Sequence, residues 1–193
     1  MIRQDSLSKM LIVISMMLTV YLATFETTTL VLFPGILLLI GLVMESYLEK
    51  HREFVDHITE TSSLKAIGYF TIIALMGMFM SGYMIDRTSM TLLSGFSAIS
   101  YGVLMAVAEE QFFRGFITDF LVTKFPSYVL ALITSACIFT IYHLARYGGQ
   151  PDAMMYVFAG GFILSWVSWK SKRLSPCMLA HAINNVIVLM GVM

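Results

Sequence analysis

Long apolar runs, broken at intervals by charged and turn-forming residues, are the feature that most limits how this chain can fold. Several runs approach the roughly 20 residues that a helix needs to cross the hydrocarbon core of a bilayer. Of the 193 residues, 58% are hydrophobic and 12% are charged, which is more apolar sequence than one soluble domain can bury. The pattern predicts an all-α, polytopic transmembrane helix bundle of about seven spans: Leu7–Phe25, Thr28–Met44, Ala66–Ile85, Leu92–Phe113, Tyr128–Tyr147, Ala153–Trp169 and Pro176–Met193.

The basic residues between these runs are unevenly divided between the two sides of such a bundle. Alternating the spans leaves only Arg87 and Arg146 on the side away from the N-terminus. By the positive-inside rule, the side that is rich in basic residues is cytoplasmic. We therefore expect a multi-pass protein of the cell membrane with a cytoplasmic N-terminus and a cytoplasmic loop over Glu45–Lys65. The basic residues on that side are Arg3, Lys9, Lys50, Arg52, Lys65, Lys124, Lys170, Lys172 and Arg173.

The charge balance limits the possible partners, and the distribution of polar sequence limits the domain organisation. Twelve Lys and Arg residues balance twelve Asp and Glu residues, so we expect the lipid bilayer as the environment and no nucleic acid as a partner. No soluble domain fits, and residues 1–193 are predicted to form a single integral membrane domain. Within it, residues 1–91 supply accessory helices. Small residues four apart, Gly77 with Ser81 and Gly161 with Ser165, favour close helix packing.

Ionisable residues recur inside the last four apolar runs, where a charge costs about 2.5–3.5 kcal/mol even on permissive insertion scales. Helical spacing places Arg114 one turn beyond Glu110, so these two side chains can form a structural ion pair. Glu109 points about 140° away from Arg114 around the helix and is expected to be the freer carboxylate, able to take a proton from water. The remaining polar members are His143, His181, Asn184 and Asn185.

These residue types suit hydrolysis. His181 and Asn185 lie one turn apart, so an imidazole N–H and an amide N–H can point at one place. Two such donors stabilise the oxyanion that develops during acyl transfer, and Glu109 with His143 completes a hydrolytic set. Three alternatives remain open: a buried polar network that only joins helices, a non-catalytic immunity or binding protein or proton-coupled carrier, and a zinc site made by Glu109, His143 and His181, although the HExxH motif is missing.

Three motifs follow one another on successive late helices: Glu109-Glu110-x-x-x-Arg114, Phe139-x-x-x-His143 and His181-x-x-x-Asn185. This order resembles the CPBP family, which comprises CAAX prenyl endopeptidases of the Rce1 type and Abi proteins linked to bacteriocin processing and self-immunity. The resemblance implies that residues 92–193 are the catalytic helices of a glutamate-dependent intramembrane endopeptidase without a metal cofactor. Its substrate would be a peptide or a membrane-anchored protein, prenylated or not.

The resemblance also implies roles for the individual side chains. Glu109 and His143 would activate a water molecule, and His181 and Asn185 would stabilise the oxyanion. The predicted spans, however, place His143 about 15 residues and His181 about five residues from the cytoplasmic side, which separates them by about 15 Å in depth. To bring the two histidines together, we expect a surface-lying or re-entrant stretch over Arg114–Pro126.

Overall fold

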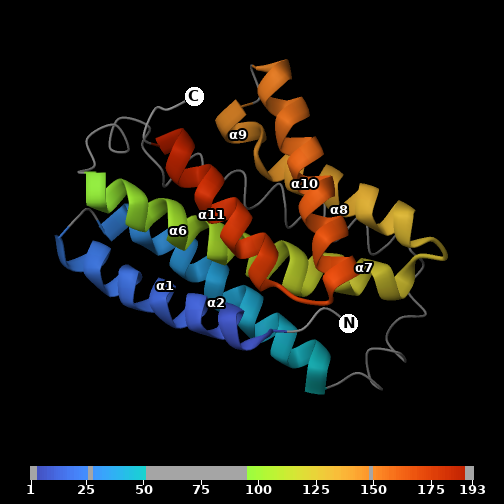
Figure 1. The fold of residues 1–193 in the computed structure, drawn as a ribbon, viewed down its shortest axis with the longest axis horizontal. Coiled ribbons are helices and arrows are strands. Elements are labelled where there is room, and N and C mark those ends of the chain that lie inside the picture. The colour runs from blue at the N-terminus through green and yellow to red at the C-terminus, as the bar shows by residue number, and fades with distance from the viewer. Residues whose placement is uncertain (1–3, 26–27, 51–94, 148–149, 190–193) are drawn as a thin grey trace.

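The computed structural model describes residues 4–25, 28–50, 95–147 and 150–189, and every regular element in these ranges is helical. The all-α prediction is therefore confirmed for the described part of the chain. The helices pack side by side as a bundle (Figure 1). Their bounds are α1 Ser6–Phe25, α2 Thr28–Lys50, α6 Gly95–Phe112, the π-helix η1 Phe113–Thr118, α7 Asp119–Lys124, α8 Tyr128–Tyr142, α9 Leu144–Tyr147, α10 Pro151–Ser171 and α11 Ser175–Leu189.

Helix α6 lies at the centre of the bundle and packs against α1, α2 and α11. Its second half presents small and apolar side chains that are fully buried, including Leu104, Ala106 and Val107. At Gly41 of α2 the two backbones approach so closely that a Cβ atom would lie 3.1 Å from the Cα atom of Phe112. Because α6 is enclosed in this way, a polar side chain in its second half is removed from both lipid and bulk water.

Side-chain contacts fix the directions of the helices around α6. The amide of Gln4, just before α1, bonds to Gln111 at 3.3 Å, whereas Tyr21 near the other end of α1 packs edge-on against Phe96. Helix α1 is therefore antiparallel to α6. The hydroxyl of Ser175 at the start of α11 donates to the carboxylate of Asp5 at 2.6 Å, so α1 and α11 begin at the same end of the bundle.

Helices α8 and α10 form an antiparallel pair that closes the other side. Gly161 of α10 is buried, and a Cβ atom there would meet the Phe139 ring at 3.0 Å. The hydroxyl groups of Thr118 and Ser135 lie 2.6 Å apart, and Ser165 lies 3.5 Å from Thr118. The predicted close packing at Gly161 and Ser165 is confirmed, whereas Gly77 and Ser81 lie outside the described residues.

The prediction of seven spans is not confirmed by the described residues. Among the described residues, one helical window, Ser6–Ala23, is long and apolar enough to cross a membrane by length and composition, and Leu32–Leu48 and Tyr128–Tyr142 are shorter apolar helices. The predicted span Ala66–Ile85 lies outside the described residues.

The prediction of a surface-lying or re-entrant stretch over Arg114–Pro126 is wrong. Helix α6 continues through η1 into α7, and every residue from 113 to 118 is buried. The helix ends only at Phe125, which is extended because the following proline disfavours helical geometry. The charged residues Asp119 and Lys124, which interrupt the apolar pattern, mark the last turns of one long helix.

Candidate active site

Two adjacent carboxylates on α6 have different surroundings. The carboxylate of Glu110 is completely buried and lies 3.2 Å from the guanidinium of Arg114 in the first turn of η1. That guanidinium also donates to the carbonyl oxygen of Gly161 at 3.2 Å and lies 4.3 Å above the ring of Phe139. On its other side, Glu110 accepts from Nδ1 of His181 at 2.7 Å. Glu110 is thus held between an arginine and a histidine, and this position suits a structural role in the site.

Glu109 faces away from the arginine, towards both histidines. Its Oε2 atom has no hydrogen-bond partner among the described residues and lies 3.6 Å from Nε2 of His181 and 3.8 Å from Nε2 of His143. These separations exceed a direct hydrogen bond of about 2.7–3.2 Å. The other oxygen, Oε1, receives a long hydrogen bond of 3.4 Å from the hydroxyl of Tyr142. The two histidines therefore lie at the same level of the bundle, which removes the separation in depth expected from the sequence.

The histidine rings are oriented by acceptors on their far sides. Nδ1 of His143, at the C-cap of α8, lies 2.9 Å from the carbonyl oxygen of Phe139. A carbonyl can only accept, so Nδ1 must carry the proton, and Nε2 of the neutral ring presents a lone pair towards Glu109. The ionised carboxylate of Glu110 fixes Nδ1 of His181 as a donor in the same way. The Nε2 atom of His181 therefore donates only when that ring carries a second proton.

The two asparagines of α11 make separate contacts. The amide nitrogen of Asn185 donates to the carbonyl oxygen of Gly102 at 3.3 Å, which ties α11 to α6. One N–H of that amide is left for a further acceptor. The side-chain oxygen of Asn184 accepts from the hydroxyl of Tyr156 at 2.5 Å. The structure thus places Asn185 within the site. Its side chain is held there by the carbonyl of Gly102 and not by the side chain of His181.

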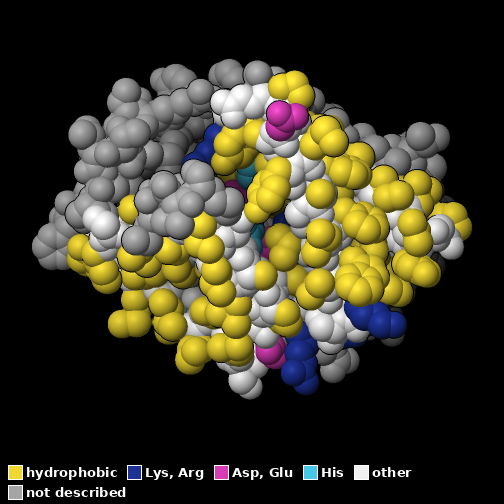
Figure 2. Space-filling model, turned by 45° about the horizontal axis from the view of Figure 1, so that its top comes forward, with side chains coloured by type: hydrophobic (Ala, Val, Ile, Leu, Met, Phe, Trp, Pro, Cys, Tyr) yellow, Lys and Arg dark blue, Asp and Glu magenta, His cyan; other side chains and the backbone are white. Residues whose placement is uncertain are grey.

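A cavity of about 470 Å³ joins these groups. Histidine atoms are visible from outside at the bottom of a hollow in the space-filling view (Figure 2). Glu110 and Arg114 are absent from its wall, which agrees with their buried positions behind it. Of the residues singled out in the sequence, the cavity is lined by Glu109, Phe139, His143, His181, Asn184 and Asn185.

Four tyrosines belong to the site or its wall, and the motifs did not indicate them. Tyr142 contacts Glu109, Tyr156 contacts Asn184, and Tyr101 and Tyr147 line the cavity. Their common signal is an aromatic side chain with a polar tip inside an apolar helix, which is easily mistaken for packing. Arg146 also lines the cavity, at the end opposite to Lys170, and stacks over the ring of Tyr147 at 5.3 Å.

In the part of the chain that the structure describes, no three His, Cys, Asp or Glu side chains are arranged to hold a metal ion. The zinc alternative therefore has no preformed ligand set among these residues, although Glu109, His143 and His181 do converge. Removal of metal ions by chelation distinguishes the two chemistries.

Comparison with known proteins places the chain. Residues 91–187 match the family model described as type II CAAX prenyl endopeptidase Rce1-like. The match spans just over half of the chain and contains all three motifs. No curated protein and no solved structure matches the chain. The chain therefore belongs to the Rce1-like family of type II CAAX prenyl endopeptidases.

Proposed function

We propose that this protein is an intramembrane endopeptidase that uses a water molecule activated by Glu109 to cleave a prenylated or membrane-anchored peptide. Family membership implies a CAAX-type protease, peptide substrates and a membrane location. The single observation that carries the mechanism is the Oε2 atom of Glu109. It is buried, accepts no hydrogen bond from the described residues, and faces Nε2 of His143 and of His181 at 3.8 and 3.6 Å.

The arrangement supports the following order of bond formation and cleavage. A water between Glu109 and His143 loses a proton to the Glu109 carboxylate as its oxygen attacks the scissile carbonyl carbon. The carbonyl electrons move to oxygen, and the resulting oxyanion accepts hydrogen bonds from the free N–H of Asn185 and from a doubly protonated His181. The C–N bond then breaks, and the proton held by Glu109 passes to the leaving amine. This returns Glu109 to its ionised state.

A side opening in the bundle supports a substrate that arrives from the bilayer. The cavity wall between α10 and α11 includes Ile163, Leu164 and Ala180, and Ile163 is 56% exposed. An apolar, outward-facing edge of this kind lets a lipid-anchored chain enter sideways while its peptide reaches Glu109. A prenyl group would then lie against side chains that do not compete for it with hydrogen bonds.

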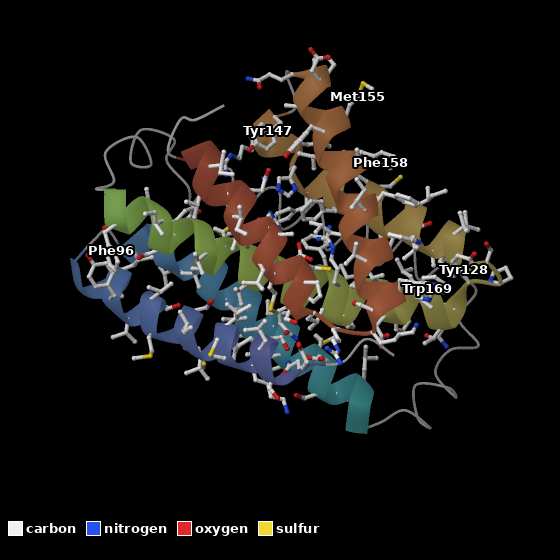
Figure 3. The ribbon with its side chains drawn as sticks, viewed as in Figure 1. Phe96, Tyr128, Tyr147, Met155, Phe158 and Trp169 are labelled. Carbon is white, nitrogen blue, oxygen red and sulfur yellow. The ribbon has the colours of Figure 1, made fainter. Side chains whose placement is uncertain are left out.

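We also propose the orientation of the bundle. Lys124, Lys170 and Lys172 lie at the end where α1 begins, and the Lys172 ammonium lies 4.9 Å above the ring of Trp169. Trp169 in turn stacks on Tyr128 (Figure 3). Basic residues next to stacked aromatic rings are typical of a cytoplasmic membrane interface. In this orientation the N-terminus is cytoplasmic.

The orientation is tested by labelling with a membrane-impermeant thiol reagent, after Cys137 and Cys177 have been replaced by alanine. We expect Gln150→Cys, which is exposed at the end that carries Arg146, to be labelled on intact cells. Lys170→Cys, exposed at the other end, should be labelled only after permeabilisation. The reverse labelling pattern would refute the proposed orientation and place the N-terminus on the outside.

The activity itself is tested with purified protein in liposomes. The probe is a fluorescence-quenched peptide that ends in a CAAX tetrapeptide, used with and without a farnesyl group on its cysteine. Wild-type protein should cleave the farnesylated probe, Glu109→Gln should not, and Asp152→Asn should cleave normally. Asp152 is an exposed carboxylate in the first turn of α10 and does not line the cavity. Equal cleavage by wild type and Glu109→Gln would refute the proposed role of Glu109.

A further inference from the structure

Tyr101 of α6 has a buried hydroxyl group with no assigned role. The side chain is 1% exposed, and its hydroxyl has no hydrogen-bond partner among the described residues. It nevertheless lines the cavity together with Glu109 and Asn185. A phenylalanine would fill the same space without burying an unpaired polar atom, which is destabilising. Packing alone therefore does not explain the hydroxyl.

The position of Tyr101 relates it to the path of a bound peptide. It precedes Glu109 by eight residues, which is about 12 Å along the helix axis. The carbonyl of the next residue, Gly102, accepts the hydrogen bond from Asn185, so the backbone at Tyr101 is held at the junction of α6 and α11.

We propose that the Tyr101 hydroxyl donates a hydrogen bond to a backbone carbonyl of the bound peptide, about three residues from the scissile bond. An extended chain rises about 3.3 Å per residue, so 12 Å corresponds to three or four residues. The inference rests on the proposed function, because it takes the cavity to be a peptide site. Tyr101 then contributes equally to binding the ground state and the transition state, and it affects KM rather than kcat.

The test is Tyr101→Phe, which removes only the hydroxyl. In the Glu109→Gln background, we expect the Kd of the farnesylated CAAX probe, measured by fluorescence anisotropy, to rise about 2- to 10-fold, as for one neutral hydrogen bond. In the active background, KM should rise by the same factor, and kcat should stay within about twofold. The Tm should rise by about 2–4 °C, because a buried unpaired donor has been removed.

Ser15→Ala is the matched control. Ser15 of α1 is also fully buried, and its hydroxyl has no hydrogen-bond partner within the described ranges, but it does not line the cavity. Its loss should raise Tm while leaving probe binding and cleavage unchanged.

Unchanged probe binding by Tyr101→Phe would overturn the inference. A fall in Tm with unchanged Kd would also overturn it, because the hydroxyl would then have a structural partner. If wild-type protein binds the probe without cleaving it, and Tyr101→Phe weakens binding, the proposed function fails but this inference stands. If the protein cleaves the probe and Tyr101→Phe has wild-type KM, the inference alone fails.

Discussion

Replacing Arg114 by alanine removes the only cation that contacts Glu110 in the described structure, besides a protonated His181. Both members of the ion pair are fully buried, so the change leaves an uncompensated carboxylate in the middle of the bundle. Breaking a buried pair in this way costs about 3–5 kcal/mol. For a chain of this length, that corresponds to a loss of about 6–20 °C in Tm.

Glu109→Gln should behave differently. The carboxylate of Glu109 makes one long hydrogen bond, with Tyr142 at 3.4 Å, and no arginine depends on it for charge compensation. The glutamine has the same size, so we expect Tm to stay within about 2 °C of wild type, a change of less than about 1 kcal/mol. Activity should nevertheless be lost, because an amide cannot take the proton from water.

The assay is thermal unfolding of detergent-solubilised protein, followed by intrinsic fluorescence and run beside the cleavage assay. Arg114→Lys is an informative control, since it keeps the charge but loses the planar fork that reaches Glu110 and Gly161 together. The double variant Glu110→Gln, Arg114→Met should lose less stability than the sum of the two single changes. If Glu109→Gln destabilises the protein as much as Arg114→Ala does, the division of labour between the two carboxylates is wrong.

Three further outcomes are expected. Exhaustive chelation should leave cleavage unchanged. Activity that is lost on chelation and restored by zinc would make Glu109, His143 and His181 metal ligands. Asn185→Ala should lower kcat by about 10²–10³-fold, as for the loss of an oxyanion donor, with little change in KM. Asn184→Ala should have a smaller effect. If steady-state kinetics show the reverse order, Asn184 and not Asn185 is the oxyanion donor. Gly41→Ala should lower Tm through a clash of about 1–3 kcal/mol, because its Cβ would lie 3.1 Å from the Phe112 backbone. Gly35→Ala should raise Tm, because its nearest neighbour would be Thr19 at 3.7 Å and alanine favours a helix over glycine. Equal Tm shifts for the two variants would contradict the close approach of α2 and α6.

Local spacing predicted those parts of the site that depend on one helix. The four-residue interval between Glu110 and Arg114 is enough to bring them together, because residues four apart lie on one face of a helix and the π-helical segment begins only at Phe113. The same geometry separates Glu109 from that pair. Helical character was also predictable from the apolar runs, since each run is long and contains few breaking residues.

Contacts between helices were not predictable in this way. The partner of Asn185 is a backbone carbonyl, that of Gly102, and a backbone group leaves no mark in the sequence. His143 and His181 were expected to share a site, but the predicted spans separated them in depth because both helices were counted from one level. Helix α8 begins beyond the end of the long helix Gly95–Lys124, whereas α11 begins beside Gly115 within that helix. Tyr142 was missed because it also packs against Phe113, so its sequence context resembles a core residue.

The π-helical segment has a consequence for how this protein tolerates changes in length. One residue is added to the turn between Phe113 and Thr118, where the Thr118 hydroxyl donates to the carbonyl five residues earlier at 2.9 Å. About six residues in π geometry turn the helix as far as about five in α geometry, so this segment absorbs one extra residue without changing the direction of the side chains that follow. Deleting one residue there, other than Arg114 or Thr118, would therefore restore a regular α-helix and leave α7 in nearly the same orientation. Deleting one residue from the α-helical part, between Gly95 and Phe112, would instead rotate everything beyond it by about 100° relative to what precedes it. The contacts of α6 with α1, α2 and α11 and those of Thr118 with Ser135 and Ser165 could then not be made together.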